Sequence, residues 1–158
     1  MNIGNQAVPA LGPADEGSKI TIGEFNYTVF KLPTDIGVPI WHKLAVGATK
    51  AIGAAVASEG EGQMVSGFIN AAMEDLSLDF VQRMIDVFAQ KTFVSRDQNL
   101  GNPLSKIVNT HFAGRYEDLS QWLVFCVEVN FTGFFTWLIS ELKTAQSKAE
   151  KVLGTNIN

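Results

Sequence analysis

Apolar residues recur at steps of three and four over most of the chain, which is the spacing of one face of an α-helix. Between residues 64 and 91 this pattern is nearly continuous, and Ser77 in its middle is a favourable N-cap residue, so we expect two helices at 64–75 and 78–91. Thr34 and Asp35 suit the start of an earlier helix that runs to about residue 58, although Pro39 leaves its first turns less sharply defined. A final helical region, one helix or a pair, is expected over 104–153.

The earlier helix is rich in small residues, which favour a close approach of a neighbouring helix. Glycine destabilises a helix interior by roughly 1 kcal/mol relative to alanine unless packing compensates for it. The small side chains recur through the second half of this helix, at Gly47, Ala48, Ala51, Gly53, Ala54 and Ala55. We therefore expect another helix to pack directly against this segment.

A strand-like pattern precedes the helices. The segment "KITIGEFNYTVFKL" predicts two strands, at 19–23 and 26–32, joined by a turn in "GEFN" and closed by Pro33. A hairpin alone is marginal in water and must pack on the helices. A further short strand is expected at Phe93–Val94 in an otherwise polar loop. The predicted fold is mainly α, a single small helical domain over 19–153 with a short N-terminal β-hairpin at 19–32, a flexible arm at 1–18 and a tail at 154–158.

The segment 111–140, "HFAGRYEDLSQWLVFCVEVNFTGFFTWLIS", is apolar on almost every side of a helix. Residues 119–140 are long enough to cross a membrane, with Glu128 their only charge. A charge at the centre of a spanning helix costs about 2.5–3.5 kcal/mol, and Asn130, Thr132 and Thr136 add to the polar load, so we expect no membrane insertion. The simplest interpretation is the central helix of a small core. A sharper one leaves the end from Phe131 to Trp137 open for a partner or a second copy of the chain.

Composition and motifs argue against catalysis and against nucleic acid as a partner. The formal net charge is −4, which gives no general attraction to phosphate backbones. Cys126 is the only cysteine, so no intramolecular disulfide can form and a reducing compartment fits. Neither His42 nor His111 has a metal-ligand neighbour at a suitable spacing, and Cys126 lies in an apolar stripe that makes it a poor partner for a Cys–His dyad. Since phosphate-binding and nucleophile motifs are also missing, we expect no enzyme, cofactor or metal.

The segment 111–135 resembles the tail assembly chaperones of tailed bacteriophages. In that family a His-Phe-x-Gly-Arg pattern is followed by an aromatic-rich helix with Val-Asn-Phe and a further Phe pair. Here these places are filled by His111, Phe112, Gly114, Arg115, Val129, Asn130, Phe131, Phe134 and Phe135, and "FKLPTDIG" at 30–37 is a second, weaker match. The resemblance implies a protein of the host cytoplasm that binds the tape-measure protein, keeps it soluble during tail morphogenesis and helps to recruit tail-tube protein.

Two sets of residues follow from the resemblance and from the aromatic surplus. The predicted partner-binding residues are Trp122, Phe131, Phe134, Phe135 and Trp137, and the predicted motif residues are His111, Phe112, Gly114, Arg115 and Asn130. Gly114 would allow a tight approach or a break before the long helix, and Arg115 would pair with Glu117, Asp118 or a partner carboxylate. For His111 and Arg115, fold maintenance and partner binding stay equally open. The alternative function is a structural component of the phage tail or particle, packed as a helical homo-oligomer.

Overall fold

The structure, a computed structural model, describes residues 16–55, 61–74 and 76–155. The predicted arm at 1–18 and tail at 154–158 lie largely outside these ranges. At the described ends of the chain, strand β1 begins at Ser18 and helix α5 ends at Thr155. The stretch between the predicted helices that end near residue 58 and begin at 64 is also partly outside them, and helix α2 begins within it, at Glu61. Within these ranges the molecule is mainly helical with a small antiparallel sheet, which confirms the predicted fold class.

The hairpin is confirmed, and it belongs to a larger sheet than the sequence indicated. Strand β1 (Ser18–Ile22) pairs antiparallel with β2 (Phe25–Val29), so the turn is at residues 23 and 24. Strand β2 ends three residues earlier than predicted, and one further hydrogen bond, from the Phe30 N–H to the carbonyl of Lys91, continues its pairing toward β3. Strand β3 (Thr92–Ser95) pairs with β2, and the short β4 (Asn102–Pro103) pairs with β3, giving the order β1-β2-β3-β4. The sheet therefore fastens the loop after residue 91 to the N-terminal hairpin.

The predicted helices are present with shifted boundaries. They are α1 (Thr34–Ala55), α2 (Glu61–Glu74), α3 (Leu78–Gln90), α4 (Val108–His111) and α5 (Tyr116–Thr155), with a 3-10 turn η1 (Leu104–Lys106) before α4. Pro39 lies inside α1 without ending it. Ser77 caps α3 as expected, and its Oγ accepts a hydrogen bond from the Phe80 N–H at 3.3 Å.

Gly47 allows α1 and α2 to pack directly against each other. A Cβ atom at this position would lie 2.7 Å from the carbonyl oxygen of Ala72 and 3.0 Å from its Cα. No side chain fits at that separation without moving one of the helices. The prediction of a close helix contact at the small-residue segment is confirmed at this position.

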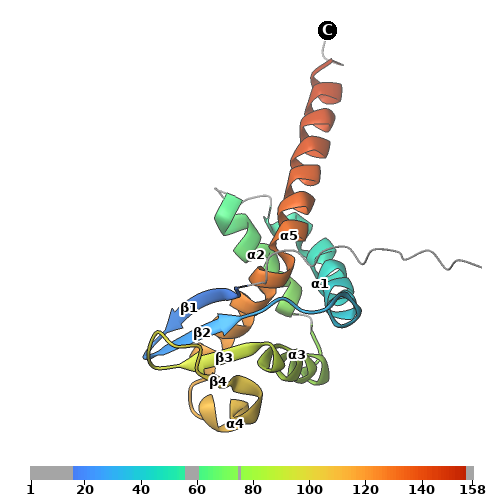
Figure 1. Cartoon of the computed structure of the whole chain (residues 1–158). Helices are drawn as coiled ribbons and strands as arrows, with labels where there is room; N and C mark the ends of the chain where they lie inside the picture. The colour runs from blue at the N-terminus through green and yellow to red at the C-terminus, as the bar shows by residue number, and fades with distance from the viewer. Residues whose placement is uncertain (1–15, 56–60, 75, 156–158) are drawn as a thin grey trace, which may run out of the picture.

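Helix α5 is the central element of the molecule. Figure 1 shows it passing behind the sheet, then beside α1 and α2, with its last turns extending beyond the other elements. Its inward side chains join one hydrophobic core with the sheet and the other helices; the fully buried ones on α5 are Trp122, Cys126, Val127 and Phe135. The Trp122 indole N–H donates to Thr92 Oγ1 at 3.3 Å, and Thr92 in turn donates to the Phe88 carbonyl at 2.8 Å. These two consecutive hydrogen bonds link α5, β3 and α3 inside the core.

The composition of α5 also meets the length and hydropathy requirements of a membrane span. An 18-residue window of this helix reaches a mean hydropathy of 1.5, and 33% of that window is buried inside the structure. A core helix meets the same requirements, and here Trp122 and Phe135 are fully covered by protein. This packing favours a core helix, and the expectation that the protein does not enter a membrane stays a prediction.

Candidate functional site

His111 and Phe112 of the sequence motif lie against the sheet. The His111 Nε2 and the Tyr27 hydroxyl are joined by a hydrogen bond of 2.8 Å, and the imidazole meets the Phe25 ring edge-on at 4.6 Å between centroids. Phe112 stacks on Tyr27 at 6.1 Å and contacts Trp122 at 5.4 Å. Burial lowers the pKa of His111, and the nearby Arg115 charge adds to this effect, so the imidazole is neutral at neutral pH. The motif therefore links β2 to the start of α5.

Arg115 is engaged within the molecule by the residues around it. Its Nε donates to Asp118 Oδ2 at 2.8 Å, a second guanidinium nitrogen contacts the same carboxylate, and the guanidinium carbon lies 4.5 Å from the centroid of the Phe25 ring. Of the three partners expected from the sequence, the structure brings Asp118 into contact. These contacts, like those of His111, favour fold maintenance over direct partner binding.

Gly114 lies in the turn between α4 and α5. Its φ angle is +72°, in the left-handed region that residues with a Cβ rarely adopt. A glycine here lets the chain reverse between His111 and Arg115, so that both side chains reach Phe25.

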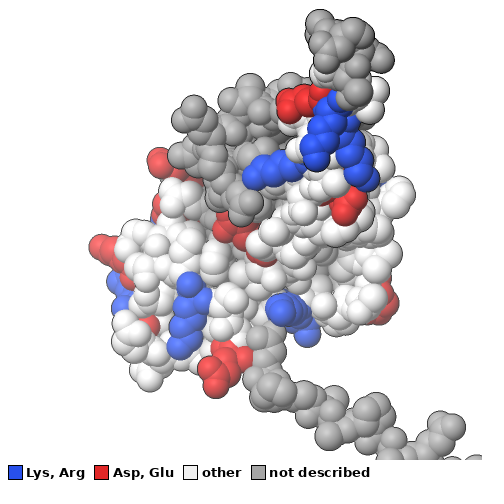
Figure 2. All heavy atoms as spheres, turned by 90° about the horizontal axis from the view of Figure 1, so that it is seen from above, with Lys and Arg blue, Asp and Glu red and all other residues white. Residues whose placement is uncertain are grey.

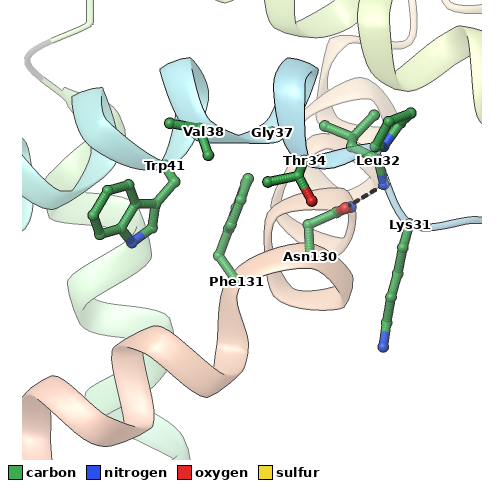
Figure 3. A pocket seen from close by; sticks show the side chains of 9 residues that line it. Lys31, Leu32, Thr34, Gly37, Val38, Trp41, Asn130 and Phe131 are labelled. Atoms are coloured by element: carbon green, nitrogen blue, oxygen red, sulfur yellow. Dashed lines mark hydrogen bonds between the residues drawn. The ribbon is translucent and has the colours of Figure 1, made fainter.

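Asn130 connects the middle of α5 to the segment that precedes α1. Its side-chain oxygen accepts the Leu32 N–H at 2.8 Å (Figure 3). Its amide group donates to the Cys126 carbonyl one turn earlier at 2.8 Å. The two bonds fix the amide orientation and satisfy a backbone donor that no strand or helix uses. Asn130 therefore positions the start of α1 beside α5.

A groove lies where α1 meets α5. It encloses about 230 Å³ and is lined by Lys31, Leu32, Pro33, Thr34, Gly37, Val38, Trp41, Asn130 and Phe131. In Figure 3 the Phe131 ring rises from α5 toward Gly37, with Trp41 and Val38 beside it on α1. The Trp41 ring meets the ring of Phe134 edge-on at 5.5 Å, and Phe134 contacts Trp137 at 6.0 Å. We call Trp41, Phe134 and Trp137 the aromatic surface.

The structure separates the predicted partner-binding residues into two groups. Trp122 and Phe135 are completely buried, so their side chains present no surface to a partner in this conformation. Phe131 is 9% exposed and forms the floor of the groove, whereas Trp137 is 56% exposed and Phe134 is half-buried between them. Partner binding by Phe131, Phe134 and Trp137 stays a prediction, and the contribution of the other two is to the core.

Trp41 and Val38 belong to this site and were not predicted from the sequence. They are 37% and 48% exposed and lie three residues apart, on one face of α1. That spacing of two large apolar residues was a usable signal. Their position beside Phe134 depends on how two helices far apart in the sequence pack together.

Nothing in the described residues forms an evident catalytic or metal centre. Across residues 16–55, 61–74 and 76–155, no group of three His, Cys, Asp or Glu side chains could hold a metal ion. Burial raises the pKa of the Cys126 thiol well above its usual value, so the thiol is unreactive. On the face shown in Figure 2, Lys and Arg are interspersed with Asp and Glu among wide uncharged areas. An aromatic groove without reactive groups is typical of proteins that bind other proteins.

Comparison with known proteins agrees with this class. A family model described as "Phage tail assembly chaperone protein, TAC" matches residues 23–143, and the chain belongs to this family. Membership of this family supports the role of a tail assembly chaperone and implies a phage tail protein as partner. No curated protein sequence and no solved structure matches the chain.

Proposed function

We propose that this chaperone binds the tape-measure protein in the host cytoplasm and keeps it soluble until the tail tube assembles around it. The observation that supports the proposal is the aromatic surface at the edge of the α1–α5 groove. A tape-measure protein must be long, and its apolar helices would aggregate without cover. A chaperone of this kind needs an apolar surface that is open in the free protein.

The aromatic surface has the properties of such a binding site. Trp137 and Trp41 are the most exposed aromatic side chains near the groove, and each is held by ring contacts to Phe134. Aromatic side chains bury roughly 150–250 Å² each and dominate the energetics of interfaces. Because Phe134 fixes both indoles, little side-chain entropy is lost when a client helix covers them.

Co-expression tests the proposal. The tape-measure protein of the same phage should be insoluble alone, and soluble and co-purifying when this chain is present. If both proteins are folded and no complex is recovered, tape-measure binding is excluded. Binding of tail-tube protein is measured in the same way, with the tape-measure protein present and absent.

A second candidate function is a structural component retained in the particle as a homo-oligomer. The observation that favours it is the end of α5, where Val152 and Leu153 are 64% and 69% exposed beyond the last core contact, at Leu142. Mass spectrometry of purified mature particles distinguishes the two functions. A chaperone is absent from the particles, and a structural component is present in stoichiometric amount.

A further inference from the structure

A second hollow lies nearer the start of α5 and shares no lining residue with the groove between α1 and α5. It encloses about 400 Å³ between β1, α2 and α5, and is lined by Ile20, Asn70, Ser120, Gln121, Val124, Phe125 and Glu128. Ile20, Val124 and Phe125 are half-buried and pack against the core, so they give the hollow an apolar wall. Among the described residues that line it, Glu128 is the one that carries a charge.

The Glu128 carboxylate is half-buried and has no partner in the part of the chain that the structure describes. The nearby Thr132 hydroxyl donates to the backbone carbonyl of Glu128 and leaves its carboxylate unused. Glu128 takes no part in the ion pair of Arg96 with Glu24 or in that of Arg115 with Asp118. Desolvation raises the pKa of Glu128, so the ionised carboxylate is less favourable in the folded protein than in the unfolded chain.

An unpaired carboxylate beside an apolar wall does not stabilise the folded protein. Glutamine has almost the same shape and would fill the position without the cost of a desolvated charge. The arrangement is complementary to a long cationic side chain, whose methylene groups pack on an apolar surface while its charged end reaches a carboxylate. The amides of Asn70 and Gln121 on the same wall can accept the remaining hydrogens of such a group.

We propose that this hollow binds a Lys or Arg side chain of the chaperone's client, flanked in the client by apolar residues. The cation pairs with Glu128, and the stem and flanking side chains cover Ile20, Val124 and Phe125. The inference rests on the proposed function, because the client is taken to be the tape-measure protein. It adds a charge requirement that the aromatic surface does not impose.

Binding of the full chain to the tape-measure protein, compared across four variants, tests the inference. Glu128→Gln should weaken binding roughly tenfold or more, and Glu128→Lys further, because the client cation then meets an uncharged or a like-charged group. Glu141→Gln is the matched control, an exposed carboxylate further along α5, and should bind like the wild type. Trp137→Asp tests the aromatic surface separately.

Thermal unfolding of the free protein separates recognition from a structural role. Glu128→Gln should melt at the same temperature as the wild type or higher, since it removes a desolvated charge without a partner. If Glu128→Gln binds as tightly as the wild type, the inference is overturned, and the same holds if Glu128→Gln loses stability and binding together. If Trp137→Asp weakens binding while Glu128→Gln does not, the proposed function stands and only this inference fails. If the wild type forms no complex, both fail.

Discussion

Asn130 on α5 accepts the Leu32 N–H at 2.8 Å and so joins two segments that are 98 residues apart in the chain. The bond lies at the groove, and it sets where α1 begins relative to Phe131. Stability and the shape of the binding surface therefore depend on the same side chain.

Asn130→Ala should lower the free energy of unfolding by about 1–3 kcal/mol, because the half-buried Leu32 donor loses its acceptor. Urea denaturation measures the change. Thr132→Ala, two residues further along α5, removes an exposed hydroxyl and should change stability by less than about 0.5 kcal/mol. Equal effects of the two substitutions would show that the Asn130 amide makes no special contribution.

Gly47→Ala and Gly67→Ala should change stability in opposite directions. At Gly47 the added methyl meets the Ala72 backbone at 2.7 Å, so α1 and α2 must separate, at a cost of about 1–3 kcal/mol. At Gly67, inside α2, nothing lies within 4 Å of the added methyl, and the gain in helix propensity is about 0.5–1 kcal/mol. Melting temperatures of the two variants measure the difference, and a stabilised Gly47→Ala would contradict the close packing.

Trp137→Asp and Phe135→Ala should separate the client surface from the core. Trp137 is 56% exposed, so its replacement should leave stability within about 0.5 kcal/mol and weaken client binding at least tenfold. Phe135 is fully buried, and truncation to alanine should cost about 3–5 kcal/mol of stability. Binding by calorimetry and unfolding in urea are the two measurements.

Leu78→Asp is the control for the Trp137 variant, since Leu78 is 82% exposed on a different helix. It should bind the client like the wild type. A loss of client binding equal to that of Trp137→Asp would indicate a general effect of added negative charge.

The pH dependence of stability should include a contribution from His111. Its pKa is lower in the folded protein than in the unfolded chain, so between these two values the unfolded chain binds more protons. Stability from this residue is therefore complete above the unfolded pKa of about 6.5 and is lost as the pH falls through the folded value. Compared with the wild type, His111→Gln should flatten this part of the curve, which urea denaturation at a series of pH values measures. A slope unchanged by the substitution would contradict the assignment.

The helices were predictable from local pattern, whereas the sheet beyond its first hairpin was not. Helix α3 could be predicted because its N-cap, Ser77, and the apolar residues spaced three and four apart after it all lie close together in the sequence. The pairing of Tyr27 with Val94 joins positions 67 residues apart, and no short-range signal selects that register. The sequence therefore predicted a strand at Phe93–Val94 and could not assign its neighbours.

The binding surface could not be predicted for the same reason, because it depends on contacts between segments that are far apart in the sequence. A helix that is apolar on every side does not reveal which side its own domain covers, so Trp122 and Phe135 could not be told apart from Trp137. Contacts with β3 and α3 cover Trp122, and ring contacts from α1 reach Phe134. His111 and Arg115 were identified by their motif, but the partners of these side chains lie on β2, where Tyr27 is 84 residues before His111.

Cys126 is a built-in chemical probe for the opening of the core. It is the only cysteine in the chain, it is fully buried, and burial suppresses its ionisation. A thiol reagent can modify it only in molecules whose core has opened around α5, so the rate of labelling reports how often that happens. A client that covers the aromatic surface and holds α5 in place would lower the rate of labelling. A substitution that loosens the core would raise it.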